Sequence, residues 1–448
     1  MSKPLVIDDQ EHERVFERVA AVDVAKDSGM VCTRAPHPAR PGARRSTVWA
    51  VRARMGTVRT LGRQLKRDGI EMVTLESTSD YWRIWYYVLE EAGVAVQLVN
   101  ASQAKNLPGR PKTDKLDVMW QARLTELGLL RPSFVPPAPV RVLRHYTRAR
   151  THLTQDRTRC WQRLEKLLED ALVKVSAVAS KLTTASVQDM IKAMIAGERD
   201  PAVLAGLART RMRSKHDALV EALTGMFAGH HADLAQLLLD QIGFLDQKIT
   251  WLTGRIDDAI TAIPAARGVD ADGTSGPYAG NSPDAIIVPA AWRLDEIPGI
   301  GPDLACSIIA ETGLDMTRFP TAAHLVAWAG LCPRTIQSGT RTRDGKGHGN
   351  TYLRGYLGQA AAAAARTDTF LGERYRRIAR RRGAAKAQVA VARSILVITW
   401  HLLADRQARY TDLGPDWYQS KIDKTRRARS HIRQLEALAY TVTITQAA

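Results

Sequence analysis

The sequence predicts an α/β domain in the N-terminal part, a long helical region in the middle and a mostly helical C-terminal domain. Residues 19–131 alternate short apolar runs with amphipathic stretches that end in glycine. Residues 141–262 carry long heptad-like patterns with almost no proline, and residues 290–405 carry helical patterns around glycine-containing turns. At 448 residues, the chain is long enough for two or three domains with cores of their own.

The N-terminal pattern resolves into a specific order of elements. Three apolar runs within residues 19–52 predict strands, and Asp23 interrupts the first of them. Helix, strand, helix, strand and helix then follow, and the three helices end at Gly69, Gly93 and Gly128. This βββαβαβα order predicts a mixed sheet covered by helices, as in an RNase H-like domain.

The remaining segments differ in composition. Residues 132–140, PSFVPPAPV, predict a proline-rich linker. Residues 141–262 predict two long amphipathic helices, which could form a coiled-coil arm for dimerisation or a hairpin within one chain. Residues 263–289 are rich in Gly, Asp, Ser and Pro and predict a flexible loop before the 290–405 domain, and residues 406–448 form a C-terminal tail.

The charge balance indicates a polyanionic partner. Lys and Arg number 64 against 46 Asp and Glu, which gives a net charge of +18. Such an excess favours nucleic acid over an anionic membrane, because no lipidation motif accompanies it. The sequence has no apolar run of membrane-spanning length and no signal-peptide core, so we expect a cytoplasmic protein with no membrane partner. The four cysteines are far apart, which disfavours a disulfide framework or a zinc site.

Two carboxylates at the start of the last helix of the α/β domain need an explanation. Asp114 and Asp117 are three residues apart, so they lie on one helix face about one turn from each other. Like charges at this spacing repel. Either Lys112 and Lys115 compensate them, or a divalent cation does.

Two more carboxylates fall where the predicted sheet would bring them towards this helix. Asp23 lies inside an apolar strand, and Glu76 ends the fourth strand, where open sheets tend to place sites. Carboxylate oxygens suit Mg²⁺ or Mn²⁺. The alternatives are a solvent-facing Asp23, a Glu76 that only neighbours a helix start and an Asp114 that caps its helix. Asp27 and Asp80 remain open as competing ligands.

The C-terminal domain carries two further motifs. IPGIGPDLACSIIAETG has the form of a helix-hairpin-helix, in which Gly299 and Gly301 permit a tight turn and exposed N–H groups could bind a phosphate. A plain helical turn is the alternative. Further on, Ser338 and Gly339 lie in a polar, basic loop between two helices. By its chemistry alone, a single loop serine is most often structural or solvated.

The motifs together resemble a known family. AVDVAKDSG, LESTSDYW and GRPKTDKLDVMWQARL resemble the three motifs of the DEDD transposases, insertion-sequence recombinases related to the Piv DNA invertase. The resemblance implies a RuvC-like N-terminal domain with a metal site for Mg²⁺ or Mn²⁺ formed by Asp23, Glu76, Asp114 and Asp117, called the acidic tetrad below. Thr78-Ser79 stands where the family more often has Thr-Gly, which affects no implied ligand.

The same family has a C-terminal domain with Pro-Arg, Ser-Gly and Gly-Asn-x-x-Leu-Arg elements, which this chain contains in that order. The resemblance implies that Ser338 is the nucleophile and forms a transient phosphoserine bond with DNA. The family's Lys-Arg-Gly-Asn is Gly347-His348-Gly349-Asn350 here, so one basic residue is missing or replaced by His348. The residues expected to contact nucleic acid are Lys112, Lys115, Gly299, Gly301, Arg334, Arg341, Arg343, Asn350 and Arg354.

The resemblance also implies partners. Members of the family use a structured bridge RNA that pairs with donor and target DNA, and they share composite sites between the subunits of a tetramer assembled from dimers. The expected function is therefore RNA-guided DNA recombination. The alternatives are a hydrolytic RuvC-like nuclease for branched DNA, an RNA-free Piv-like invertase and a non-enzymatic nucleic-acid-binding scaffold.

Overall fold

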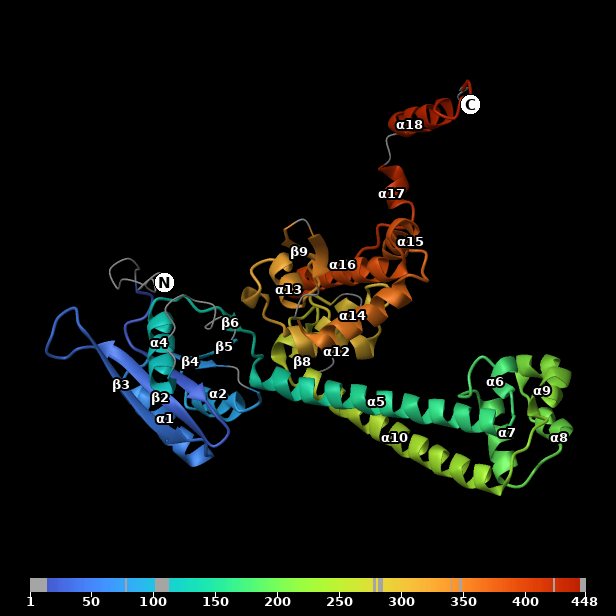
Figure 1. Cartoon of the computed structure of the whole chain (residues 1–448), viewed down its shortest axis with the longest axis horizontal. Coiled ribbons are helices and arrows are strands. Elements are labelled where there is room, and N and C mark those ends of the chain that lie inside the picture. The colour runs from blue at the N-terminus through green and yellow to red at the C-terminus, as the bar shows by residue number, and fades with distance from the viewer. Residues whose placement is uncertain are drawn as a thin grey trace. The chain divides into compact units, whose positions relative to one another are not determined.

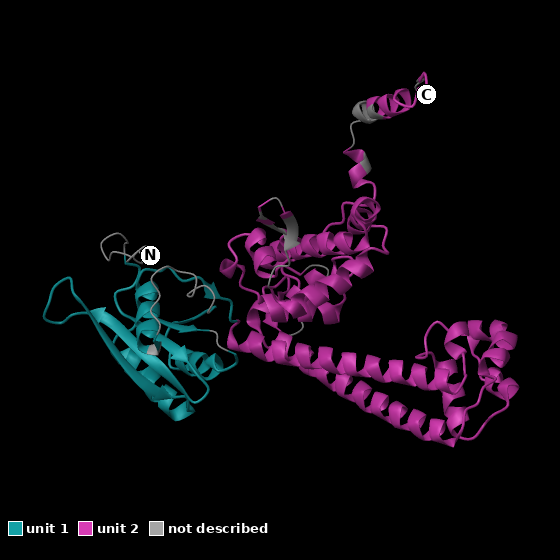
Figure 2. Ribbon diagram, in the orientation of Figure 1, with its two compact units in different colours: residues 1–135 teal, residues 136–448 magenta. Residues whose placement is uncertain are grey.

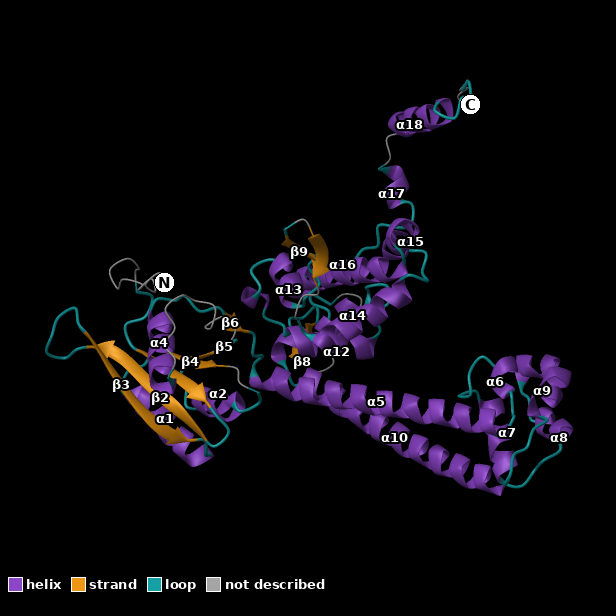
Figure 3. Ribbon diagram, in the orientation of Figure 1, coloured by secondary structure: helices purple, strands orange, loops and turns teal. Residues whose placement is uncertain are grey.

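The computed structural model describes residues 14–76, 79–100, 113–276, 279–280, 285–339, 341–345, 349–421 and 424–443. The chain divides into two compact units, residues 1–135 and residues 136–448 (Figure 2). The first unit contains a six-stranded sheet, and the second is mostly helical (Figure 3). The expected order of an α/β region followed by helical regions is confirmed.

The sheet of the first unit is mixed. Its strands are β1 (Val19–Val24), β2 (Ser28–Pro36), β3 (Arg44–Arg52), β4 (Met72–Glu76), β5 (Val96–Val99) and β6 (Pro132–Ser133). The strand order is β3-β2-β1-β4-β5-β6, in which β1, β4 and β5 run parallel and the other pairs are antiparallel (Figure 1). The parallel strands bring the carboxyl ends of β1 and β4 to the same edge.

The prediction of a linker over residues 132–140 is wrong at both ends. Pro132 and Ser133 form the edge strand β6, in which Pro132 pairs with Val99. Helix α5 already begins at Ala138. Proline has no N–H to donate, so an edge strand tolerates it where a central strand would not.

Helices cover both faces of the sheet. α1 (Met55–Arg67) and α2 (Trp82–Glu91) pack on the face formed by Ala20, Val22 and Val24 of β1. α4 (Asp114–Glu126) packs on the opposite face, against Val19 and Ala21. Alternate residues of a strand point to opposite faces, so Asp23 belongs to the α4 face.

The second unit begins with a helical arm. α5 (Ala138–Asp170) and α10 (Gly229–Thr261) are long helices that pack along each other. They run antiparallel, because Arg150 contacts Thr253 and, further along α5, Cys160 contacts Gln241. The prediction of two long helices is confirmed, and they form a hairpin within one chain. Short helices connect them, namely α6 (Val175–Val178), α7 (Ala185–Ile195), α8 (Pro201–Gly206), η1 (Thr210–Lys215) and α9 (His216–Leu223).

The prediction of a flexible loop over residues 263–289 is wrong for much of its described part. η2 (Pro264–Ala266) is followed by β7 (Gly268–Val269), which pairs with β8 (Ser275–Gly276). Val269 also bridges to Ile287. Gly268 permits this close packing, because an added Cβ would lie 2.4 Å from the Ala279 carbonyl oxygen.

The C-terminal domain is helical around one central helix. Its helices are α11 (Ala290–Asp295), α12 (Pro302–Thr312), η3 (Met316–Arg318), α13 (Ala322–Trp328), α14 (Thr351–Ala364), α15 (Phe370–Arg382) and α16 (Ala384–Ala404). α16 is long and apolar enough to cross a membrane by length and composition alone, but it packs against α13, α14 and α15 and includes Lys386 and Arg393. The 406–448 tail contains α17 (Trp417–Ser420) and α18 (Lys424–Glu436).

Candidate active site

Two carboxylates of the acidic tetrad lie side by side at the carboxyl edge of the sheet. The parallel register of β1 and β4 pairs Val22 with Leu75, and Asp23 and Glu76 are the next residue on each strand. Both belong to the face covered by α4, since Asp23 alternates with Ala21 and Glu76 contacts α4 directly. Asp23 is half-buried, and Glu76 is only 5% exposed.

Hydrogen bonds between α4 and β4 place the start of α4 at this edge. Thr125 contacts Thr74 at 2.6 Å, and one turn earlier the Gln121 amide donates to Glu76 at 2.7 Å. Four residues of a helix and two residues of a strand each cover about 6 Å, so successive turns of α4 face alternate residues of β4. One further turn towards the start of α4 brings Asp117 beyond the end of β4. Asp117, which is half-buried, is therefore carried by the part of α4 that lies at the carboxyl end of β4.

The start of α4 resolves one alternative for Asp114. The N-cap is Thr113, whose hydroxyl accepts from the Leu116 N–H at 3.4 Å, so the interpretation of Asp114 as the cap is wrong. Asp114 is the first residue of the helix, and its side chain lies outside what the structure describes. A negative charge is favoured in the first turn of a helix, which lowers the cost of two neighbouring carboxylates there.

The remaining charged candidates near the tetrad are two carboxylates, Asp27 and Asp80, and two lysines. Asp27 forms an ion pair with Arg54 at 3.7 Å, and Asp80 pairs with Arg83 at 2.8 Å. Both carboxylates are largely exposed, and arginine partners satisfy them. Lys115 is exposed on α4, and Lys112 lies outside the described residues.

Gln121 is a site residue that sequence analysis missed. Its side chain is 2% exposed, and its amide nitrogen is committed to Glu76. Its carbonyl oxygen Oε1 is buried without a hydrogen-bond partner among the described residues. A buried acceptor without a donor is costly, and it is the kind of oxygen that a cation or its water shell can use. The available signal was the position of Gln121, one turn after Asp117 on the same helix face.

The serine segment is not the irregular loop that the sequence predicted. β9 (Arg334–Ser338) and β10 (Arg341–Gly345) form an antiparallel hairpin, called the serine hairpin below. Ser338 ends β9 and pairs with Arg341, and Gly339 begins the turn with φ +59°. The side chains of Ser338, Arg334 and Arg343 lie outside what the structure describes, and Arg341 is exposed. The serine backbone is therefore at the tip of a hairpin.

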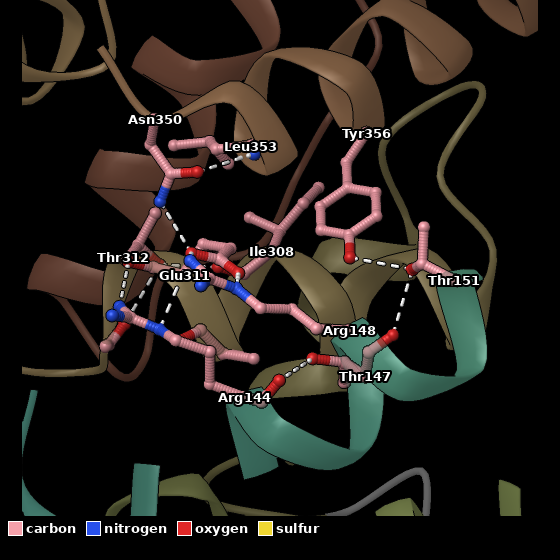
Figure 4. A network of polar contacts seen from close by, with 12 residues as sticks. Arg144, Thr147, Arg148, Thr151, Ile308, Glu311, Thr312, Asn350, Leu353 and Tyr356 are labelled. Carbon is pink, nitrogen blue, oxygen red and sulfur yellow. Dashed lines mark hydrogen bonds and ion pairs between the residues drawn. The ribbon is translucent and has the colours of Figure 1, made fainter. Parts of the chain in front are cut away.

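A buried polar network lies behind the start of α14, which follows the serine hairpin (Figure 4). Glu311 of α12 is fully buried and accepts two hydrogen bonds from Arg148 of α5, at 2.7 and 2.9 Å. Burial acts to lower the pKa of Arg148, but the hydrogen bond and charge of Glu311 outweigh it and raise that pKa above its ordinary value. Arg144 donates to the Ala310 and Glu311 carbonyl oxygens at 2.8 Å each. The network joins the arm to α12.

Asn350 belongs to this network. Its carbonyl oxygen accepts from the Leu353 N–H at 3.1 Å and caps α14, and its amide donates to Glu311 at 2.5 Å (Figure 4). Both ends of the side chain therefore have partners within the fold, and a contact of Asn350 with phosphate stays a prediction. Asn350 positions the helix that follows the serine hairpin. Arg354, one turn later, is half-buried.

The predicted helix-hairpin-helix corresponds to α11, a turn and α12. Gly301 is the residue before α12, and an added Cβ there would meet no atom within 4 Å. Gly299 has φ +90°, and a Cβ there would lie 2.2 Å from the Ala360 carbonyl oxygen of α14. The structure thus explains Gly299 by close packing on α14, and Gly301 is the glycine that is open to a ligand.

A second group of metal-ligand types lies at the far end of the arm, where Asp170, His230 and His231 have ligand atoms within 4.8 Å of one another. His231 is already engaged, because its Nδ1 accepts from the Ala228 N–H at 3.0 Å and its Nε2 contacts Asp170 at 3.2 Å. Metal binding at Nε2 would put the proton on Nδ1, where it would face the Ala228 N–H. His231 therefore acts as part of the cap of α10.

Two segments of the chain match known protein families. Residues 20–172 match a DEDD-type transposase model of the IS110 group, and residues 291–376 match the transposase IS116/IS110/IS902 family. A 52-residue stretch is 46% identical to the insertion element IS110 uncharacterized 43.6 kDa protein of Streptomyces coelicolor, strain ATCC BAA-471 / A3(2) / M145. That stretch covers 12% of this chain and 13% of the relative.

These two segments are similar, in this order, to two domains of insertion-sequence transposases, and such domains are those of enzymes that cut and rejoin DNA. More narrowly, residues 20–172 are similar to the DEDD-type transposases of the IS110 group.

Proposed function

We propose that this protein is a site-specific DNA recombinase of an insertion sequence, which cuts and rejoins DNA through a covalent phosphoserine intermediate. One observation carries the proposal. Asp23 and Glu76 follow a paired position on adjacent strands, under the helix that carries Asp117. The net charge of +18 supports a nucleic-acid substrate.

The donor set at the sheet edge fits a divalent cation. It consists of carboxylate oxygens and the unpartnered Gln121 Oε1, which are hard ligands of the kind that Mg²⁺ and Mn²⁺ prefer. The acidic tetrad would hold the ion, as in a RuvC-like domain. When bound, the ion would neutralise phosphate charge and so lower the barrier to attack by an oxygen nucleophile.

The proposed covalent step uses Ser338. Its hydroxyl oxygen bonds to the phosphorus, its proton leaves, and one DNA ester oxygen departs as a hydroxyl after taking a proton. Attack by a hydroxyl from another DNA end on the phosphoserine then restores a phosphodiester and frees the serine. Arg334, Arg341, Arg343 and Arg354 would hold the phosphate through charge-assisted hydrogen bonds. Because the tetrad and Ser338 belong to different units, the reaction requires folding or assembly to bring them together.

The family resemblance supports two finer proposals. A bridge RNA encoded outside this sequence would pair with donor and target DNA. The arm of α5 and α10 would serve as a coiled-coil dimerisation element, and dimers would assemble into a tetramer with shared sites. Gly301 and the start of α12 would hold a DNA backbone, because a helix N-terminus offers free N–H groups to phosphate.

The experiment that tests this function uses the full chain and a plasmid that carries its gene with native flanking DNA. We expect Ser338→Ala and Asp117→Asn each to abolish recombination. A hydrolytic RuvC-like nuclease would instead keep DNA cleavage in Ser338→Ala and lose it in Asp117→Asn. Unchanged recombination in both variants would refute the proposed site.

The guide is tested by sequencing the RNA that co-purifies with the protein. One discrete RNA encoded beside the gene would support RNA guidance. Random cellular RNA with a well-folded preparation would refute guidance and favour the RNA-free invertase.

A further inference from the structure

A hollow lies on the sheet face opposite the acidic tetrad. It has a volume of about 770 Å³ and lies between α1 and the end of α2. Four cations of α1 line it, with Glu91 as the acidic member. These cations, called the basic stripe below, are Arg59, Arg63, Lys66 and Arg67.

The basic stripe follows from the amphipathic pattern of α1. Val58, Leu61 and Leu65 are buried against the sheet, which fixes the orientation of the helix. The four cations are spaced i, i+4, i+7 and i+8, so they share another face. Arg63, Lys66 and Arg67 are exposed, and Arg59 is half-buried.

The four cations of the basic stripe outnumber the acidic side chains that pair with them. Like charges four residues apart, as at Arg59 and Arg63, destabilise a helix. Arg59 pairs with Glu91 at 3.2 Å, but the two side chains are 38% and 58% exposed, so the pair contributes little. In the described part of the chain, the ion pairs do not involve the other three cations.

The helix dipole favours a positive charge at only two of the four positions of the basic stripe. Lys66 and Arg67 lie in the last turn of α1, where the helix dipole favours cations. Arg59 and Arg63 lie earlier, where the dipole has little effect. A ligand with several negative charges would stabilise these two residues.

The dimensions of the stripe match a nucleic-acid strand. From Arg59 to Arg67 the helix rises about 12 Å. Over that length a strand presents about three phosphates, at about 3.4 Å of axis for each. Guanidinium groups bind phosphate oxygens in a bidentate geometry, which favours arginine in this role.

We propose that the basic stripe of α1 binds the phosphate backbone of a nucleic-acid strand, as a second contact separate from the acidic tetrad. The inference rests on the proposed function only in that the ligand is a nucleic acid. The sheet lies between the stripe and the tetrad, because α1 and α4 pack on opposite faces. The phosphates held here are therefore not the phosphate that is attacked at the tetrad of the same domain, and the stripe serves to hold and orient the nucleic acid.

The test compares two full-length variants that each lose three positive charges. Arg63→Gln/Lys66→Gln/Arg67→Gln changes the stripe and leaves the Arg59–Glu91 pair intact. Lys181→Gln/Lys192→Gln/Arg211→Gln changes three exposed cations among the short helices that connect α5 and α10. Glutamine is a good helix former, so both proteins should remain folded, which circular dichroism checks.

Binding is measured by fluorescence anisotropy in EDTA, with labelled single-stranded RNA, hairpin RNA and duplex DNA over a range of salt concentrations. Each lost phosphate contact reduces the slope of log K against log salt by about 0.7–0.9. We expect the stripe variant to lose about two units of slope on at least one probe, while the control variant keeps the wild-type slope. The probe that shows the loss identifies RNA or DNA as the ligand.

Equal slopes for the stripe variant and the wild type on all probes would overturn the inference, as would equal losses in the two variants. Cleavage plays no part in EDTA, so the outcome does not depend on the tetrad. If Asp117→Asn and Ser338→Ala leave recombination unchanged but the stripe slope falls, the proposed function fails and the binding site stands.

Discussion

The hydrogen bond between Gln121 and Glu76 should control the metal affinity of the acidic tetrad. Gln121→Met removes the amide donor that lies 2.7 Å from Glu76 while it keeps a similar volume and a good helix propensity. Glu76 would then keep its buried carboxylate without the partner that fixes its orientation. The same substitution also removes the unpartnered Oε1 atom beside the site.

The size of the effect follows from the burial of both groups. Glu76 is 5% exposed and Gln121 is 2% exposed, so water cannot easily replace the lost donor. A hydrogen bond to a charged group contributes about 1.5–3 kcal/mol, and loss of a partner that orients a metal ligand typically lowers affinity about 10–100-fold. We therefore expect Mn²⁺ affinity to fall about 10–100-fold in Gln121→Met.

The assay is a titration of the full chain with Mn²⁺, in which electron paramagnetic resonance measures free ion. Thr125→Val is the matched control, because it removes the buried 2.6 Å hydrogen bond to Thr74 one turn further along α4 and does not touch Glu76. The control should bind Mn²⁺ within about twofold of the wild type if the effect is specific to Glu76. Equal Mn²⁺ affinity for Gln121→Met and the wild type, with the fold intact, would refute the reasoning.

Three more predictions concern the rest of the chain. Arg148→Met should lower the free energy of unfolding of the second unit in urea by about 3–5 kcal/mol, because it leaves the fully buried Glu311 without its bidentate partner. The double variant Arg148→Met/Glu311→Leu should recover part of this loss. Equal stability of Arg148→Met and the wild type would contradict a stabilising role of the network. Gly299→Ala should lower the melting temperature of the second unit, because Gly299 has φ +90° and an added Cβ would lie 2.2 Å from the Ala360 carbonyl oxygen. Gly301→Ala should destabilise the unit by less than about 1 kcal/mol, because an added Cβ there would meet no atom within 4 Å. Melting curves that rank the two variants in the opposite order would be inconsistent with this packing. Burial raises the pKa of the Cys32 thiol to about 11 and that of the Cys306 thiol to about 12. Iodoacetamide at pH 8 should therefore label the half-exposed Cys332 before these two cysteines. Faster labelling of Cys32 or Cys306, measured by mass spectrometry, would contradict this prediction.

Sequence patterns predicted those parts of the fold that local periodicity encodes. The alternating apolar runs and the terminal glycines indicated β1 to β5 and the helices α1, α2 and α4, with ends that differ from the observed ones by at most a few residues. β6 was missed, because a two-residue strand that contains a proline has no period of its own. The serine hairpin was missed because RTIQSGTRTRDG carries almost no apolar residues, so its alternation has no hydrophobic signal.

The charged residues of the candidate site were predictable from the sequence, but the residues that contact and position them were not. Carboxylates at a strand centre, a strand end and a helix start are conspicuous because such charges need compensation. The role of Gln121 depends on how α4 is aligned with β4, and the roles of Asn350 and Gly299 depend on contacts with Glu311 and α14. Such long-range contacts leave no local pattern in the sequence.

The proposed recombination requires Ser338 to become covalently attached to DNA. The most direct measurement incubates the full chain, with its co-purified RNA, Mg²⁺ and native flanking DNA, then denatures the mixture and locates nucleotide-bearing peptides by mass spectrometry. We predict an adduct on the peptide that contains Ser338, which Asp117→Asn abolishes. Cleaved DNA without any adduct at Ser338 would contradict the account.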